Sequence, residues 1–133
     1  MESNSRPRVL LVEDETDLLF LLQRALRENG FEAETCVEGH VALARALACP
    51  PDLFVLDWML PGIDGLELCQ RLKADPRTAH VPVLLITARG READVFRAFT
   101  EGVDDCLIKP FSNAEFVGRV RALARPARPV SSR

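Results

Sequence analysis

The chain contains few of the residues on which several classes of protein depend. Its 133 residues include no tyrosine, one tryptophan, two histidines and four cysteines that are scattered without short spacings. So few histidines do not favour a histidine-rich metal site, and the cysteine spacing matches neither a disulfide framework nor a zinc ribbon. No apolar run approaches the roughly 20 residues that a membrane-spanning helix needs. We therefore expect no membrane protein and no metal site built on histidine and cysteine.

What is present is typical of one soluble globular domain. Hydrophobic residues make up 47% of the chain and charged residues 28%, which is the ordinary globular mixture. Residues 1–8 are polar and no apolar signal-peptide core follows them, which predicts a cytoplasmic protein. We divide the chain into a disordered flank (1–7), a domain (8–125) and a linker or disordered tail (126–133), because the end is rich in proline, arginine and serine.

The net charge of −3 hides an asymmetry. Residues 119–133 contain five of the 17 basic residues and no acidic one, which leaves 12 basic against 20 acidic residues in the rest of the chain. An acidic body does not favour broad contact with nucleic acid, so we expect no direct nucleic-acid binding by this domain. It suits a cation site or a docking face for a basic partner.

Short apolar runs alternate with amphipathic segments along the chain. The runs, which predict β-strands, are Arg8–Val12, Glu32–Cys36, Leu53–Leu56, Val81–Ile86 and Asp104–Ile108. Three of them are continuously apolar, as in strands covered on both faces of a parallel sheet, and the second and fifth are expected at the edges. Helical spacing predicts five helices, over Leu18–Leu26, Val41–Ala48, Leu66–Leu72, Ala93–Thr100 and Phe116–Ala124.

These elements predict an α/β protein with an open, doubly wound sheet of five parallel strands and five helices, a three-layer sandwich. Gly30 is expected to end the first helix in a left-handed conformation, and Ser112 with Glu115 forms a capping box before the last helix. Ligands of such sheets bind beyond the carboxyl ends of the strands. The residues that end each strand are therefore the candidates for chemistry.

Polar side chains stand at four of these strand ends. They are Glu13-Asp14-Glu15, Asp57, Thr87 and Lys109. Acids from two strands supply the oxygen ligands that a hard divalent cation prefers, such as Mg²⁺. In this arrangement Asp57 would accept a phosphoryl group as an acyl phosphate, while the cation, Lys109 and Thr87 would bind the phosphoryl oxygens.

Each of these residues also has an ordinary structural explanation. Alone, Asp57 could cap a loop, the acids of 13–15 could begin a helix as solvated side chains, Thr87 could be a plain strand residue and Lys109 a surface charge. The site is favoured because all four fall at the ends of predicted strands.

The same residues resemble a known family. Val12-Glu-Asp-Glu15, Asp57-Trp-Met-Leu-Pro-Gly-Ile-Asp-Gly65, Thr87-Ala-Arg89 and Lys109-Pro-Phe111 resemble the receiver domain of two-component response regulators, in the same order and over nearly the whole chain. The resemblance implies a flavodoxin-like sheet with strand order 2-1-3-4-5. It implies that a sensor histidine kinase or a phosphotransfer protein phosphorylates Asp57.

The resemblance also implies the metal ligands and the partners. Mg²⁺, with Mn²⁺ as an alternative, would be held by Asp14, Asp57 and the backbone carbonyl of Met59, with Glu13 acting through water. An effector domain or partner protein would respond to a change in one face of the domain. This face is formed by the predicted helix over 93–100, the predicted strand over 104–108 and the predicted helix over 116–124. A homodimer could form on that face.

One departure from the family affects the switch. The position that holds a tyrosine or phenylalanine switch residue in this family is Cys106 here. Cysteine has no aromatic ring that could move between an exposed and a buried rotamer, so Cys106 is interpreted as a packing residue. The other switch and output positions are Ala88 and Pro110, and the peptide bond before Pro110 is expected to be cis. Trp58 is interpreted as an exposed loop aromatic beside the metal that could anchor a partner.

Two alternative functions remain open. A degenerate receiver would bind partners without phosphorylation. The absence of an aromatic residue at Cys106 is consistent with this alternative, whereas the presence of Asp14, Asp57, Thr87 and Lys109 argues against it. An aspartyl-nucleophile phosphatase would need an acid two residues after its nucleophile, where this chain has Met59. Because Met59 cannot activate water, the phosphorylated form is expected to decay slowly, and the chain is interpreted as a phosphoacceptor rather than an enzyme. The stretch over residues 72–82 is longer than is usual in winged-helix members of the family. Its length resembles that of receivers that stand alone or are attached to cyclases or kinases.

Overall fold

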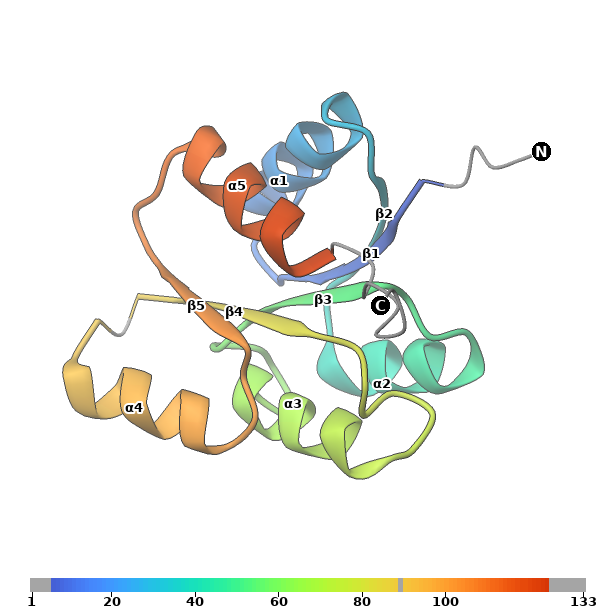
Figure 1. Ribbon diagram of the computed structural model, residues 1–133, viewed down its shortest axis with the longest axis vertical. Helices are drawn as coiled ribbons and strands as arrows, with labels where there is room; N and C mark the ends of the chain where they lie inside the picture. The colour runs from blue at the N-terminus through green and yellow to red at the C-terminus, as the bar shows by residue number, and fades with distance from the viewer. Residues whose placement is uncertain (1–5, 89, 125–133) are drawn as a thin grey trace, which may run out of the picture.

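Parallel β-strands alternate with α-helices throughout the computed structural model, which describes residues 6–88 and 90–124 (Figure 1). The strands are β1 (Arg8–Val12), β2 (Glu32–Cys36), β3 (Leu53–Asp57), β4 (Val83–Thr87) and β5 (Asp105–Ile108). The helices are α1 (Thr16–Glu28), α2 (Gly39–Ala48), α3 (Gly65–Ala74), α4 (Glu92–Thr100) and α5 (Asn113–Ala124).

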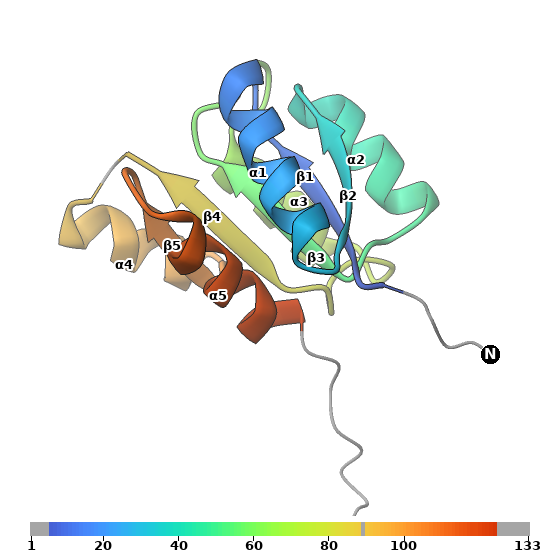
Figure 2. The same ribbon diagram turned by 90° about the horizontal axis from the view of Figure 1, so that it is seen from above.

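The sheet has the predicted topology. Its strands are all parallel and lie in the order β2-β1-β3-β4-β5, with β2 and β5 at the edges as expected. Helices α1 and α5 lie side by side on one face, and α2, α3 and α4 cover the other (Figures 1 and 2). The predicted three-layer α/β sandwich is therefore confirmed. No helix within the described ranges combines the length and apolar character that crossing a bilayer would require.

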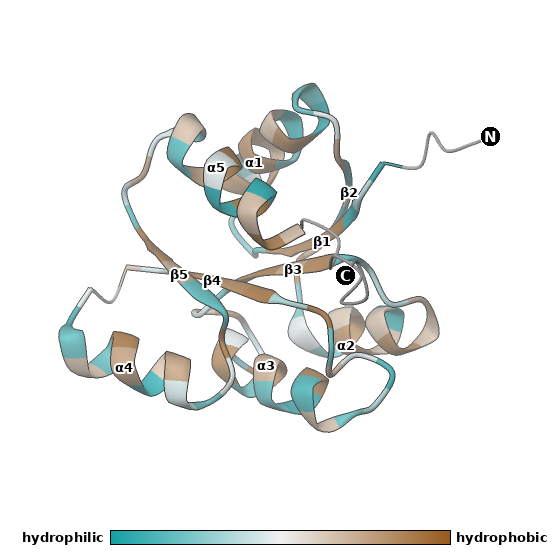
Figure 3. Ribbon diagram, in the orientation of Figure 1, coloured by the Kyte–Doolittle hydropathy of each residue, from teal (hydrophilic) through white to brown (hydrophobic). Residues whose placement is uncertain are grey.

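Side chains of the central strands alternate between two separate cores. On β3, Leu53 and Val55 point into the core under α1 and α5, whereas Phe54 and Leu56 point into the core under α2 and α3. Because successive side chains of a strand point to opposite faces, a strand that is covered on both faces must be apolar throughout. The hydropathy colouring in Figure 3 shows this along the central strands.

Element boundaries differ from the prediction at three strands, of which β5 begins at Asp105 rather than Asp104. β4 begins at Val83 rather than Val81, because Pro82 has no N–H for the sheet and Val81 instead closes a turn on Thr78. β3 continues to Asp57, which pairs in register with Ile86. A polar side chain ended the apolar pattern there, but backbone pairing does not depend on side-chain polarity.

The predicted helix ends are found where the sequence places them. Gly30, which follows the C-cap residue Asn29 of α1, has a φ of 92°, which is the left-handed conformation expected of it. Ser112 Oγ accepts a hydrogen bond from Glu115 N–H at 3.0 Å at the start of α5. The predicted flanks lie largely outside the described residues, although Pro7 O accepts a hydrogen bond from Glu32 N–H.

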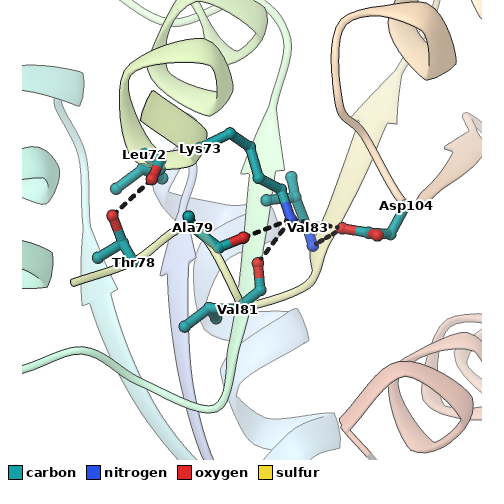
Figure 4. A network of polar contacts seen from close by, with 7 residues as sticks. All are labelled: Leu72, Lys73, Thr78, Ala79, Val81, Val83 and Asp104. Carbon is teal, nitrogen blue, oxygen red and sulfur yellow. Dashed lines mark hydrogen bonds and ion pairs between the residues drawn. The ribbon is translucent and has the colours of Figure 1, made fainter. Parts of the chain in front are cut away.

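A lysine joins three segments at the amino-terminal edge of the sheet (Figure 4). Lys73, on α3, donates from Nζ to Val81 O at 2.9 Å, to Ala79 O at 3.5 Å and to Asp104 Oδ2 at 3.0 Å. The same Asp104 oxygen accepts Val83 N–H at 2.8 Å, while Asp104 N–H donates to Val83 O. The network thus ties α3 and the loop before β4 to the turn before β5.

Removing this ammonium group should destabilise the fold more than removing an exposed ion pair. Lys73→Met removes the charged donor of two carbonyls and of the Asp104 carboxylate, which keeps only Val83 N–H, and this loss costs about 1–3 kcal/mol of unfolding free energy. Arg71→Met is the matched control, because Arg71 only pairs with Glu67 on the exposed face of the same helix, which is worth about 0.5 kcal/mol. Urea unfolding measures both, and equal losses would contradict the assignment.

Candidate functional site

Four strands deliver polar side chains to the carboxyl edge of the sheet. Glu13 and Asp14 directly follow β1, Asp57 and Thr87 are the last residues of β3 and β4, and Lys109 directly follows β5. The ladder fixes their relative heights, because Asp57 pairs with Ile86, Thr87 pairs with Ile108, and Lys109 N–H donates to Thr87 O at 2.8 Å. We expected these residues together at the carboxyl edge of the sheet, and the structure places them there.

The Asp57 carboxylate is buried and held in one orientation. Its Oδ1 accepts the Met59 N–H at 2.9 Å, and its Oδ2 accepts Lys109 Nζ at 2.8 Å. Burial works to lower the pKa of Lys109, but the hydrogen bond from Lys109 to Asp57 and the nearby carboxyl groups raise it above its usual value. The ammonium group therefore stays charged beside Asp57 at neutral pH.

Glu13 is a second buried carboxyl group in this site. Its Oε2 accepts Glu15 N–H at 3.0 Å, but no described residue donates a hydrogen bond to its Oε1, from which Lys109 Nζ lies 3.7 Å away. The pKa of Glu13 is raised to about 8, mainly by burial and in addition by the neighbouring Asp57 carboxyl group. At neutral pH without a cation, Glu13 therefore retains its proton.

These acids fit a divalent cation. Glu13, Asp14 and Asp57 each offer a carboxylate oxygen, and these atoms lie within 4.8 Å of one another. Asp14 is exposed, so a hydrated ion can enter, whereas the Glu13 oxygen without a donor is an acceptor that a cation or its water could satisfy. Carboxylate oxygens are the ligands that Mg²⁺ and Mn²⁺ take in proteins.

Other predicted positions surround this cluster. Met59 projects an exposed side chain between two buried neighbours. Ala88, after β4, and Pro110, after Lys109, are exposed, and the Lys109–Pro110 peptide bond is cis as the family resemblance implied. Arg89 lies outside the described residues.

Cys106 is buried on β5 in the core under α2, α3 and α4. Burial raises the pKa of its thiol to about 11. The thiol therefore stays protonated near neutral pH and is not a reactive thiolate. This agrees with the packing role predicted for it.

The interpretation of Trp58 as an exposed loop aromatic is wrong. Its side chain is only 2% exposed and packs in the core under α2 and α3. The physical reason is the strand alternation: Phe54, Leu56 and Trp58 share one face of β3, so the pattern continues one residue beyond Asp57. The spacing of the apolar residues carried this signal, but the polar residue at 57 obscured it.

The loop after Asp57 depends on two glycines. Gly62 has a φ of 80°, and a Cβ at Gly65, the first residue of α3, would lie 2.1 Å from Asp57 O. The start of α3 therefore lies in direct contact with the backbone of the candidate phosphorylation site, which allows no side chain at position 65.

The fold and the site define a class: a doubly wound, flavodoxin-like α/β protein with an acidic, lysine-containing site at the carboxyl edge of its sheet. Residues 9–121 match the model of the response regulator receiver domain. The chain belongs to this family. The family-level prediction made from the sequence is therefore confirmed.

Relatives with known names are transcriptional regulators. The chain is 45% identical over 123 residues to the phosphate regulon transcriptional regulatory protein PhoB of Rhizobium meliloti (strain 1021), covering 92% of the chain and 54% of that protein. It is 43% identical to the DNA-binding dual master transcriptional regulator RpaA of Synechocystis, covering 90% and 49%. The chain thus spans about half the length of these relatives. Their names give no support to the predicted likeness to receivers of cyclases or kinases.

Solved structures share the fold. A putative response regulator from Chloroflexus aurantiacus superposes with a TM-score of 0.86 at 34% identity, covering 90% of this chain and 98% of that one. The chemotaxis response regulator CheY4 of Vibrio cholerae reaches a TM-score of 0.85 at 23% identity, covering 90% and 99%. At that identity the second likeness concerns the fold alone.

The raised pKa of Glu13 predicts a pH dependence of stability in metal-free protein. Glu13 keeps a proton in the folded state up to about pH 8, whereas the unfolded chain releases it near its ordinary pKa of 4.5. Its contribution to stability is therefore present below pH 4.5 and is lost as the pH rises to about 8. Glu13→Gln removes this titration, so the variant should gain stability relative to wild type between pH 5 and pH 8.

Urea unfolding in EDTA at several pH values measures this difference. Glu15→Gln is the matched control, because Glu15 is exposed and its backbone N–H, rather than its carboxylate, is hydrogen-bonded to Glu13. It should keep a constant stability difference from wild type. A constant difference for Glu13→Gln as well would show that Glu13 is ionised in the folded protein.

Proposed function

We propose that the chain is a phosphorylation-activated signalling switch of a two-component system. In this proposal Asp57 accepts a phosphoryl group from a sensor histidine kinase or a phosphotransfer protein, with Mg²⁺ bound by Glu13, Asp14, Asp57 and the Met59 carbonyl. The observation that supports it best is the Asp57 carboxylate, which is held between Lys109 Nζ and Met59 N–H with two further carboxyl groups beside it. Membership of the receiver family supports the same conclusion.

The proposed transfer follows from these contacts. A carboxylate oxygen of Asp57 attacks phosphorus, the P–N bond to the donor histidine breaks, and the electron pair leaves with the imidazole. Phosphoryl transfer is catalysed mainly by positioning and by neutralising charge on the equatorial oxygens. Lys109 neutralises one oxygen, Thr87 donates a hydroxyl hydrogen bond to another, and a bound Mg²⁺ would supply the remaining positive charge.

The alternatives are less well supported. A phosphatase of the aspartyl-nucleophile kind needs an acid where this chain has an exposed Met59. Met59 also leaves attacking water without a base, so the acyl phosphate should be long-lived and the chain acts as a phosphoacceptor rather than a turnover enzyme. A degenerate receiver would not need the Asp57–Lys109 pair, in which the Asp57 carboxylate is buried and Lys109 is partly buried, because taking a carboxylate out of water is costly.

The output is proposed to pass through α4 rather than a rotating aromatic ring. Cys106 is small and buried, whereas α4 has a single fully buried side chain, Ala98, among its described residues. The helix begins five residues after Thr87, so a change at Thr87 reaches its amino-terminal end first. The receiver domain, residues 8–125, would then act on an effector domain or partner protein, without contacting nucleic acid itself.

Phosphorylation of Asp57 is tested with a small-molecule phosphodonor such as acetyl phosphate and Mg²⁺. Wild type should gain one phosphoryl group, whereas Asp57→Asn should gain none, measured by intact mass and phosphate-affinity gels. Lys109→Met should reduce the rate at least about 100-fold, because the pair to Asp57 is lost.

Asp64→Asn is the matched control for these variants. Asp64 lies in the same loop and caps α3 by accepting Glu67 N–H, a role that asparagine also fills. This variant should be phosphorylated like wild type. Phosphorylation of Asp57→Asn at the wild-type rate would place the acceptor elsewhere.

A second copy of the chain is the proposed partner of the α4–β5–α5 face. Phe96 and Phe99 on α4 and Ile108 on β5 are 72%, 44% and 42% exposed. The charges around them are of both signs, and Arg119 pairs with Asp105 within the chain at 3.1 Å. A mixed, apolar-centred face can be complementary to itself across a two-fold axis.

Dimer formation is tested by light scattering after size-exclusion chromatography, with and without beryllofluoride and Mg²⁺. Wild type should shift toward the dimer with the phosphoryl mimic. Phe96→Asp should stay monomeric, because an unpaired carboxylate would be buried. Phe20→Asp is the control, because Phe20 is equally exposed but lies on α1. A mimic-induced dimer of Phe96→Asp would exclude this face.

A further inference from the structure

We propose that Trp58 is a positioning residue of the phosphorylation site. Its indole, anchored in the core under α2 and α3, fixes the backbone segment that orients the Asp57 carboxylate and carries Met59. The inference rests on the proposed function of Asp57, which it deepens. It starts from the correction above, that this side chain lies inside the protein rather than on its surface.

The anchor follows from the alternation of β3. Phe54, Leu56 and Trp58 enter one core, while Leu53 and Val55 enter the other. Asp57, which lies between Leu56 and Trp58, is therefore flanked on both sides by large buried side chains that hold the chain by the same face. An indole is the largest side chain available for this purpose and buries the most apolar surface.

Backbone contacts hold the same peptide groups from two other directions. Trp58 N–H donates to Ile86 O of β4 at 2.9 Å, and Gly65 N–H donates to Trp58 O at 2.8 Å. A Cβ at Gly65 would lie 2.9 Å from Trp58 Cα and closer still to Asp57. The residue after Asp57 is thus confined by a strand, by the start of α3 and by its own side chain.

This confinement reaches the reacting group through Met59. The Met59 N–H donates to Asp57 Oδ1, and its neighbours Trp58 and Leu60 are both buried, so its backbone is tethered at each end. A change in the path of the chain at Trp58 therefore shifts the Met59 N–H and, with it, the carboxylate. Outer groups that orient metal ligands in this way typically change metal affinity 10- to 100-fold when they are replaced.

The test compares Trp58→Leu and Trp58→Phe with a matched control, Phe54→Leu. Phe54 is a buried aromatic of β3 that packs in the same core as Trp58 and lies three residues before Asp57. The first readout is hydrogen exchange of the Met59 and Gly65 amides in EDTA, which needs neither metal nor phosphorylation. The second is the Mg²⁺ dissociation constant, measured by calorimetry, and the third is the phosphorylation rate with acetyl phosphate.

Trp58→Leu should speed exchange of the two loop amides at least tenfold beyond its effect on core amides, and weaken Mg²⁺ binding about tenfold. Trp58→Phe should restore most of both. Phe54→Leu should speed exchange of core and loop amides alike and leave Mg²⁺ binding unchanged. If Trp58→Leu does not fold, the same comparison is made with Trp58→Met.

Equal effects of the position 58 and position 54 variants on loop exchange and Mg²⁺ binding would overturn the proposal, since both would then act only through stability. This outcome differs from failure of the proposed function. A wild-type protein that binds Mg²⁺ but takes no phosphoryl group would refute the switch, whereas the exchange and Mg²⁺ measurements would still decide the role of Trp58.

Discussion

The contact between Lys109 Nζ and Asp57 Oδ2, at 2.8 Å, is the interaction on which the rest of the site depends. It brings one positive charge to three carboxyl groups that lie within 4.8 Å of one another. One lysine cannot balance three negative charges, so a proton on Glu13 or a bound cation must compensate for the remainder. In the metal-free form, burial first and the neighbouring Asp57 carboxyl group second raise the pKa of Glu13 to about 8, so Glu13 carries that proton. An incoming cation therefore displaces a proton rather than simply filling a prepared negative site, and its affinity should fall with acidity.

The geometry that creates this crowding comes from the sheet. Parallel strands end at one edge, and the register of β1, β3, β4 and β5 offsets the ends of neighbouring strands by no more than one residue. Such an arrangement is stable only if both faces of the sheet are covered, which the two cores provide. The apolar residues that exclude water from those cores also bury Asp57 and Glu13, so stability and reactivity have the same origin.

The sequence predicted most of this because its signals were local and repeated. Continuous apolar runs, strand-end acids and the glycine after α1 each depend on a few neighbouring residues, and they gave the strand count, the edge strands and the convergence of the site. The prediction failed where a non-local contact decides. Val81 is outside β4 because it closes a turn on Thr78. Trp58 is buried because α2 and α3 cover the face to which Phe54 and Leu56 also point, a continuation that the polar residue at 57 obscured. The pKa of Glu13 belongs to the same class, since it depends on the burial that three separate strands produce.

Among the described residues, the two ends of the proposed output helix differ in exposure and in their side-chain hydrogen bonds. At the carboxyl end of α4, Glu101 accepts hydrogen bonds from Arg97 on α4 and from Gln70 on α3, and the Lys73–Asp104 network holds the following turn. The amino-terminal end is exposed from Gly90 to Ala93, close to Thr87. In the proposed switch, a phosphoryl group that drew Thr87 toward Asp57 would act first on this amino-terminal end, and the carboxyl end would be the pivot. Such a displacement would reach α4 from Thr87, so the proposal does not require a tyrosine or phenylalanine at position 106.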